Sequence, residues 1–284
     1  MNATVKVEGG RAVELNVARA MANSAANALV LGPAPGELGA LERSGLQYQP
    51  FFMRGTAHLL KYKERYFVVF SRHQVLSAGD ELLGHPWVLV SENSDFMLTS
   101  PVFKSSPIDT EEPIEHADIA AIELSHSEVA KHGGFQDRFF QLGESFRPPS
   151  ADTSDKWMLV GFPHKGDVFD DKTDPPTFKR SFVELFGEPA LEDRSSPKEI
   201  CDLVLFPRLE GGKVLEGEFD GLSGSPVFAW SAINSELWYR GMVITGGSDR
   251  VRLIRELCIR RFLDAVIVGH IETQTLNQRH GVAR

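Results

Sequence analysis

The sequence predicts an all-β chain with one helix near each end. From residue 47 onward, short apolar segments of strand length are separated by polar turns, and they fall into two groups on either side of a linker at residues 143–155. Apolar residues recur at the helical period only near residues 12–30 and 251–268. We therefore expect two β domains, preceded by a partly helical extension and followed by a helix.

Length and composition restrict the class of protein. A chain of 284 residues has room for about two domains, and a hydrophobic fraction of 42% with 19 Phe is enough for a substantial core. The net charge of −9 and the pI near 5.5, without a block of Lys and Arg, disfavour nucleic acid and anionic membranes as partners. No apolar run reaches the length of about 18 residues that a transmembrane helix needs.

Cysteine usage indicates a reducing compartment. Only Cys201 and Cys258 are present, whereas small secreted domains often carry several disulfides. The first 32 residues hold acidic and polar side chains where a secretory signal would have its apolar segment. We therefore expect a cytoplasmic protein.

The amino-terminal extension, residues 1–48, is rich in Ala and Asn. Apolar residues near helical spacing predict a helix over residues 12–30, and the Gly- and Pro-rich segment at residues 32–36 would end it. Packing on the body of the protein is the role we expect for this extension. Covering a cleft and mediating assembly are the alternatives.

The first β domain is expected over residues 49–145. Strands are predicted at residues 51–60, 65–70, 87–90, 96–98 and 119–124. The first two flank the polar turn at residues 61–64 and are typical of a hairpin. A Pro- and acid-rich loop over residues 100–117 delivers Asp118 to the start of the last strand.

The second β domain is expected over residues 146–250. Its predicted strands lie at residues 157–161, 178–186, 200–206, 226–230 and 238–244. In the closing region, residues 251–284, apolar residues recur at i, i+3 and i+4 with arginines on the opposite face, which predicts a helix over residues 251–268. The tail from Gly269 is expected to be frayed.

The segment FDGLSGSPVFAW, residues 219–230, places Ser223 between two glycines and ahead of a proline and an apolar run. Gly221 permits a turn tight enough to bring its own amide and that of Ser223 to one small hole, and Gly224 lets the chain leave without a Cβ. A serine hydroxyl is a good nucleophile only when a base takes its proton and amide donors await the oxyanion. Ser223 is therefore a candidate nucleophile, with an ordinary turn serine as the alternative.

A base and a carboxylate are available upstream of this serine. His73 ends an apolar strand, and Asp118 opens the strand-like run DIAAIEL. Asp118 follows His73 by 45 residues and precedes Ser223 by 105, and this order and spacing favour Asp118 over its neighbours Glu115 and His116. None of the other histidines has the same strand-then-turn setting: they are His58, His85, His116, His126, His132, His164, His270 and His280.

Four ordered segments of the chain carry a likeness to a known family: RGTAHLL at residues 54–60, VVFSRHQV at 68–75, ADIAAIEL at 117–124 and DGLSGSPVF at 220–228. Together with the weaker segments MLVGFP at 158–163 and RGMVITGG at 240–247, they resemble the trypsin- and chymotrypsin-like serine peptidases, especially the bacterial HtrA-like ones. One short match would be weak, but four in order are hard to obtain by accident. The resemblance implies two six-stranded antiparallel β-barrels of the chymotrypsin-like kind, with the site between them and with no cofactor or metal.

The resemblance also implies a role for each site residue. His73 would act as general base, Asp118 would hold its tautomer, and Ser223 would form an acyl-enzyme with a polypeptide substrate. The amides of Gly221 and Ser223 would form the oxyanion hole. The primary pocket would be lined by Gly217, Ile244, Thr245 and Gly246. Because Gly217 carries no charge, we expect a small to medium apolar residue before the scissile bond.

Several positions depart from the pattern of this family. Ser71 and Arg72 replace small residues before the histidine, Ser225 replaces a glycine after the nucleophile, and Leu222 replaces the aspartate before it. In trypsin-like zymogens that aspartate pairs with a new amino terminus made by cleavage. An ammonium buried beside Leu222 would be unpaired, at a cost of several kcal/mol. We therefore expect an oxyanion hole that is either preformed or ordered by a ligand or a regulatory protein partner.

A non-catalytic binding module of the same fold and a metal site are two alternatives. The binding module requires a distorted site, because all three candidate catalytic residues are present. A metal bound by His116, Asp118 and His126 would lack both the helix-borne H-E-x-x-H pattern and paired cysteines.

An α/β-hydrolase esterase is a third alternative, because it could also use Ser223 within Gly221-x-Ser223. It would need a helix after the serine, whereas Pro226 and the apolar run after it favour a strand. Its aspartate and histidine would have to follow the serine, and the choices are Asp249, Asp264, His270 and His280.

Overall fold

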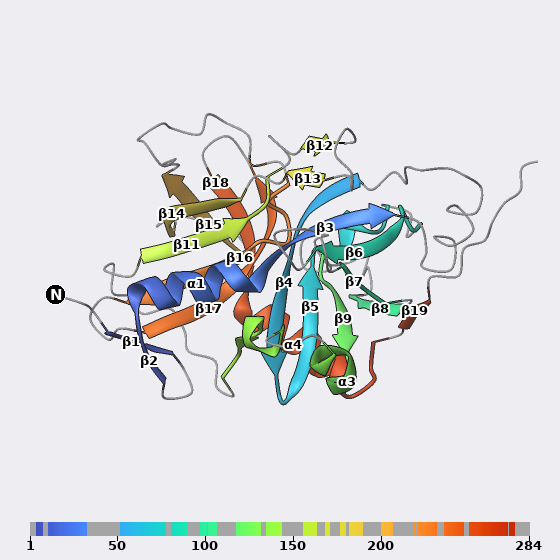
Figure 1. The fold of residues 1–284 in the computed structure, drawn as a ribbon, viewed down its shortest axis with the longest axis horizontal. Coiled ribbons are helices and arrows are strands. Elements are labelled where there is room, and N and C mark those ends of the chain that lie inside the picture. The colour runs from blue at the N-terminus through green and yellow to red at the C-terminus, as the bar shows by residue number, and fades with distance from the viewer. Residues whose placement is uncertain are drawn as a thin grey trace, which may run out of the picture.

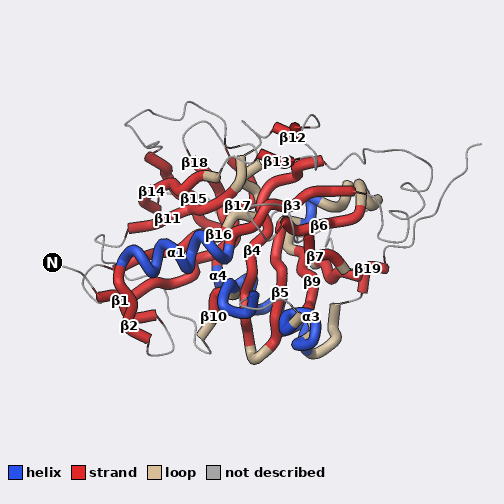
Figure 2. Tube along the Cα trace, viewed as in Figure 1, coloured by secondary structure: helices blue, strands red, loops and turns tan. Residues whose placement is uncertain are grey.

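The computed structural model folds the chain into two curled β-sheets that lie side by side (Figure 1). Strands make up most of the described backbone, as Figure 2 shows. The all-β architecture of two barrels that the sequence predicts is confirmed. The described residues are 4–7, 11–32, 52–77, 81–89, 97–100, 102–106, 118–131, 135–143, 156–163, 168–170, 177–179, 182–189, 200–206, 219, 221–231, 236–246, 250–271 and 273–275.

The first sheet has the strand order β19-β8-β9-β5-β4-β3-β6-β7, and β10 pairs in addition with β4. β4 and β5 form the predicted hairpin. Its turn consists only of Lys63 and Glu64, which both have positive φ (46° and 60°), as a tight two-residue turn requires. The strands are β3 (Ala26–Gly32), β4 (Phe52–Tyr62), β5 (Arg65–Phe70), β6 (His85–Leu89), β7 (Met97–Thr99), β8 (Val102–Ser105), β9 (Ala120–Leu124), β10 (Phe140–Gln141) and β19 (Thr273–Thr275).

The second sheet has the order β16-β11-β14-β15-β18-β17-β1-β2, and β16 also pairs with β17. This last pairing closes six antiparallel strands into a ring. The strands are β1 (Thr4–Val7), β2 (Arg11–Glu14), β11 (Lys156–Gly161), β14 (Val183–Pro189), β15 (Ile200–Phe206), β16 (Pro226–Ser231), β17 (Glu236–Gly246) and β18 (Arg250–Arg255).

Residues 178–186 and the stretch before Asp118 both differ from the sequence-based expectation. The segment 178–186, expected as one strand, is divided between β13 (Thr177–Lys179), which pairs with β12 (Val168–Asp170), and β14 in the second sheet. β8 lies within the stretch expected to be the loop before Asp118, where Lys104 and Ser105 pair with β9. The strand that leads toward Asp118 is therefore itself anchored to the first sheet.

The amino-terminal extension belongs to the body of the protein. Its helix, α1 (Leu15–Ala25), is shorter than the predicted helix over residues 12–30 at both ends. Residues 11–14 form β2, and residues 26–32 form β3 between β4 and β6 of the first sheet. Ala22 and Ala25 are fully buried, and Arg19 forms a 2.7 Å ion pair with Glu184 on β14. The α1 helix therefore packs against both sheets.

The carboxyl-terminal region also differs from the prediction of one helix over residues 251–268. β18 occupies Arg250–Arg255 and pairs with both β15 and β17, and α4 (Glu256–Ile267) begins only after it. The tail, expected to be frayed, contains β19, which pairs with β8. One short helix, α3 (His126–Ala130), has no counterpart in the prediction. No helix in the described ranges is long and apolar enough to span a membrane.

A single apolar cluster joins the two sheets. It includes Leu60 and Phe67 from the first sheet, Phe228 and Tyr239 from the second, and Ala22 from α1. Two further clusters fill the remaining inner faces, one in each sheet. Because the largest cluster is shared, side chains carried by different sheets are held in a fixed relation to one another.

Candidate active site

The serine lies in a tight turn at the start of β16, residues 221–225, which we call the Ser223 turn. Gly221 and Gly224 have positive φ, 87° and 82°, which glycine adopts without strain. Within the described part of the chain, neither the Gly221 amide nor the Ser223 amide donates to a carbonyl. Both proposed oxyanion donors are therefore left without a described protein acceptor.

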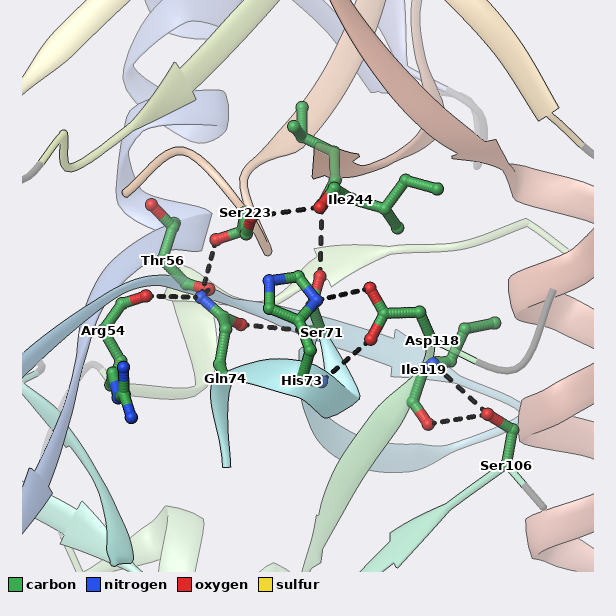
Figure 3. A network of polar contacts seen from close by, with 11 residues as sticks. Arg54, Thr56, Ser71, His73, Gln74, Ser106, Asp118, Ile119, Ser223 and Ile244 are labelled. Carbon is green, nitrogen blue, oxygen red and sulfur yellow. Dashed lines mark hydrogen bonds and ion pairs between the residues drawn. The ribbon is translucent and has the colours of Figure 1, made fainter. Parts of the chain in front are cut away.

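His73 and Asp118 are brought together by the pairing of β5 with β9. His73 lies in a 3₁₀ helix, Arg72–Gln74, directly after β5, and Asp118 lies just before β9. One oxygen of Asp118, Oδ2, is 2.6 Å from His73 Nδ1, and Oδ1 accepts a 2.9 Å hydrogen bond from the His73 amide (Figure 3). The carboxylate therefore places the proton of a neutral His73 on Nδ1 and leaves Nε2 as the basic nitrogen.

The Ser223 hydroxyl does not bond to His73 in this structure. Its Oγ donates to the Ile244 carbonyl oxygen at 3.1 Å, as Figure 3 shows. Ile244 falls at an irregularity of the pairing between β17 and β18, where the register shifts between Val243 and Thr245. Hydrogen bonds between a nucleophile and its base are often formed only with substrate bound, and rotation about χ1 moves Oγ between staggered positions.

Two further residues of the site, Gln74 and Thr56, have no signal in the sequence. Gln74 is 2% exposed; its Oε1 accepts from the Ser71 amide at 2.8 Å, and its Nε2 donates to the Ser223 carbonyl at 2.7 Å. The Thr56 amide donates to the same carbonyl at 3.0 Å. A glutamine beside a candidate histidine and a threonine in a strand are both ordinary, so only the contacts across the two sheets reveal their role.

Ser225 and Ser71, two of the departures from the pattern of the resembled family, form hydrogen bonds in the structure. Ser225 is fully buried and its Oγ donates to Thr56 Oγ1 at 3.0 Å. A Cβ at Gly161 would lie 2.0 Å from Ser225 Oγ, so a glycine there leaves the room that the hydroxyl occupies. Ser71 is also fully buried, and its Oγ donates to the Val243 carbonyl at 3.2 Å.

Leu222 and Arg72 are the other two departures. Leu222 is 1% exposed and belongs to the apolar cluster of the second sheet, with Trp157 and Leu253 among its members. Arg72 is 8% exposed; burial lowers its pKa, and the charge of Asp118 opposes that shift.

The expected pocket residues are only partly within the described chain. Ile244 is buried, whereas Thr245 and Gly246 are exposed. A Cβ at Gly246 would lie 2.5 Å from Phe219 Cβ, so the buried Phe219 packs directly on this wall. Gly217 lies outside the described residues.

The rival residues are placed elsewhere or lie outside the described ranges. His85 is buried on β6 with its ring against Trp87, and His126 is exposed at the start of α3. Asp264 forms an ion pair with Lys63 at 2.6 Å. No group of three His, Cys, Asp or Glu side chains able to hold a metal occurs among the described residues. The candidates outside them are Glu115, His116, His132, His164, Asp249 and His280.

Comparison with known proteins finds similarity at the level of solved structures. The sequence matches no protein-family model and no curated protein. The structure is similar to a Glu endopeptidase (15% identity, 75% of this chain, 85% of that chain, TM-score 0.46) and to protease Anisep from Arthrobacter nicotinovorans (9%, 82%, 90%, 0.46). It is also similar to the HtrA-type protease AlgW (12%, 89%, 67%, 0.49). All three are proteases by name, and the likeness extends over most of this chain.

Proposed function

We propose that the chain is a serine endopeptidase of the trypsin type, which cleaves polypeptides through His73, Asp118 and Ser223. The observation that carries this proposal is the pair of hydrogen bonds that Asp118 accepts from His73, because it leaves Nε2 as the basic nitrogen. The Ser223 turn, which leads into the second sheet, carries the hydroxyl. It also carries the amides of Gly221 and Ser223, which donate to no described carbonyl. A base, a nucleophile and an oxyanion hole are the parts that acyl transfer requires.

The reaction follows from these positions. Ser223 Oγ leaves the Ile244 carbonyl and attacks the scissile carbonyl, while His73 Nε2 takes the hydroxyl proton and later gives it to the leaving amine. Asp118 stabilises the imidazolium that forms. The amides of Gly221 and Ser223 hold the oxyanion, each contributing about 3 kcal/mol in comparable sites. Water then hydrolyses the acyl-enzyme with His73 acting again as base.

Substrate, partner and location follow as proposals from the same residues. The uncharged Gly217 and the wall at Ile244, Thr245 and Gly246 support a small to medium apolar residue before the scissile bond. Phe219, packed on Gly246, supports the smaller end of this range. We place the enzyme in the cytoplasm, on the basis of its two cysteines, and we expect a regulatory protein partner or a ligand only where the oxyanion hole is not preformed.

A catalytically silent binding module is the second candidate function. The observation in its favour is the hydrogen bond from Ser223 Oγ to the Ile244 carbonyl, because the hydroxyl proton is then directed to Ile244 and not to His73. The alternative assignment as an α/β-hydrolase esterase is wrong, because Pro226 begins a strand, β16, where that class has a helix.

Labelling with a fluorophosphonate separates these two candidates. We expect the wild-type chain and the control variant Ser127→Ala, which alters an exposed serine, to be labelled and to cleave a peptide library. Ser223→Ala should lose both activities, because the nucleophile is removed. It should keep the melting temperature of the wild type, because the Ser223 hydroxyl makes a single hydrogen bond within the described part of the chain. Cleavage by Ser223→Ala at the wild-type rate would end the serine-peptidase proposal.

A further inference from the structure

A buried histidine that the proposed reaction does not use contacts the Ser223 turn. His58 lies on β4 of the first sheet and is 0% exposed. Its Nδ1 is 2.9 Å from the Gly224 carbonyl oxygen, and its Nε2 is 2.8 Å from the hydroxyl of Tyr239 on β17. The imidazole therefore bridges two parts of the second sheet from the first.

The direction of both hydrogen bonds follows from chemistry. A carbonyl oxygen only accepts, so His58 Nδ1 carries the proton and Nε2 must accept from the Tyr239 hydroxyl. Burial lowers the pKa of His58 to about 4, with the Gly224 hydrogen bond acting in the opposite direction. Burial also raises the pKa of Tyr239 well above its ordinary value, so the hydroxyl keeps its proton. At neutral pH the chain of donors thus runs from Tyr239 to His58 to Gly224.

The neighbouring peptide group is held from the first sheet as well. The Ser223 carbonyl accepts from both the Thr56 amide, at 3.0 Å, and Gln74 Nε2, at 2.7 Å. The Gly224 amide, in the same peptide group, donates to the Val243 carbonyl at 2.8 Å. No side chain fits here, because a Cβ on Gly224 would lie 1.8 Å from the Thr56 carbonyl oxygen.

In two consecutive peptide groups, both the carbonyl and the amide form hydrogen bonds. In the group that follows Gly224, the carbonyl accepts from His58 and the Ser225 amide donates to the Leu222 carbonyl at 2.9 Å. Fixing both planes fixes the backbone on the carboxyl side of Ser223, including the position of its Cα. The Ser223 amide, on the other side, stays available for an oxyanion.

We propose that His58 and Gln74 are positioning residues, which hold the Ser223 turn from the first sheet so that Oγ and the two amide donors meet the substrate in one geometry. The proposal rests on the proposed role of Ser223 as nucleophile. His73 and Ser223 come from different sheets, so their alignment depends on contacts that cross between the sheets. A misplacement of about 1 Å in a catalytic group lowers rates about a hundredfold.

The experiment measures the stability of the Ser223 turn as well as the rate of the reaction. His58→Phe removes the donor to Gly224, and Gln74→Leu removes the donor to Ser223. His126→Phe is the matched control, because it makes the same change at an exposed histidine. For each variant we would measure hydrogen exchange of the Gly224 and Ser225 amides, fluorophosphonate labelling, kcat, KM and the melting temperature.

We expect exchange of the Gly224 and Ser225 amides to quicken in His58→Phe and Gln74→Leu, while exchange in β5 and β9 stays as in wild type. Labelling and kcat should fall about a hundredfold with KM changed less than threefold, and His126→Phe should match wild type. A merely structural role would instead lower the melting temperature and quicken exchange throughout both sheets. Unchanged exchange in the turn of the folded variants overturns the proposal.

Two further measurements keep the proposal separate from folding and from the proposed function. If His58→Phe does not fold, Tyr239→Phe is the replacement variant, because it removes only the hydroxyl that donates to His58. The ¹⁵N chemical shifts of His58 in the wild type report its tautomer. Protonation on Nε2 would overturn the proposal. If the wild type takes no fluorophosphonate yet the turn amides respond as expected, the peptidase function fails and the holding of the turn by His58 and Gln74 stands.

Discussion

Asp118 binds His73 through both of its carboxylate oxygens, one at the imidazole Nδ1 and one at the backbone amide. The backbone bond fixes where the carboxylate lies, and the side-chain bond then fixes how the imidazole is turned. The Asp118 side chain is 10% exposed and that of His73 is 51% exposed, so the carboxylate is shielded from solvent while the base stays accessible to a substrate. This arrangement gives different roles to two residues that are 45 positions apart.

Asp118→Asn should lower kcat by about 10⁴ with little change in KM. An amide that keeps its oxygen at the His73 backbone N–H presents its own N–H to His73 Nδ1. The imidazole proton then lies on Nε2, and the basic nitrogen that the reaction needs is lost. The measurement is steady-state cleavage of a peptide found by library profiling. Glu123→Gln, which changes an exposed carboxylate of β9 paired with Arg65, is the control. Wild-type kinetics in Asp118→Asn would move the carboxylate role to Glu115 or another acid.

The free energy of unfolding should fall as the pH is lowered from 6.5 toward 4, in part because of His58. Folding lowers the pKa of His58 from 6.5 to about 4. Between these values the unfolded chain binds more protons than the folded protein, so lowering the pH favours the unfolded state. The full difference corresponds to about 3 kcal/mol. Urea unfolding of wild type, His58→Phe and His126→Phe at several pH values measures it. The slope should be smaller in His58→Phe than in the other two, and equal slopes would contradict a buried neutral His58.

Gly161→Ala should destabilise the protein by about 1–3 kcal/mol, because the new Cβ would lie 2.0 Å from Ser225 Oγ and 2.9 Å from Thr56 Oγ1. Ser225→Gly removes the closer contact and should recover part of that loss. A double-mutant cycle measured by urea unfolding gives the coupling energy between the two sites, which we expect to be at least 0.5 kcal/mol in magnitude. Additive effects within error would show that the crowding is relieved elsewhere.

The intact chain should react with a fluorophosphonate without any prior cleavage. Leu222 occupies the position where an inserted amino terminus would need a carboxylate, and it is buried among apolar side chains. An ammonium there would be unpaired and desolvated. Mass spectrometry of the chain expressed from Met1, before and after labelling, tests this. Labelling of Ser223 that begins only after cleavage ahead of the first sheet, with the new terminus buried beside Leu222, would show the prediction to be wrong.

The structure corrects the sequence-based expectation where a local pattern competes with strand pairing. Residues 250–255 alternate arginines with Val251, Leu253 and Ile254, a pattern that continues into the helical spacing of α4. As a strand, however, this segment pairs with β15 and β17 at once and completes the second ring. The same holds for residues 26–30, whose apolar residues near helical spacing indicate a helix but which belong to β3 and pair with β4 and β6. Tertiary pairing outweighs intrinsic preference in both places.

The sequence by itself determined the all-β class, most of the strands, and the order of His73, Asp118 and Ser223, because strand alternation, turn residues and motif spacing are written in neighbouring positions. Only the tertiary structure decided that Asp118 bonds to His73, that Ser223 Oγ points to Ile244, and that His58 and Gln74 contact the Ser223 turn. His58 is 166 positions from Gly224, and Gln74 is 149 from Ser223. Contacts between residues so far apart arise from how the two sheets pack, and one sequence holds no local pattern that reports them.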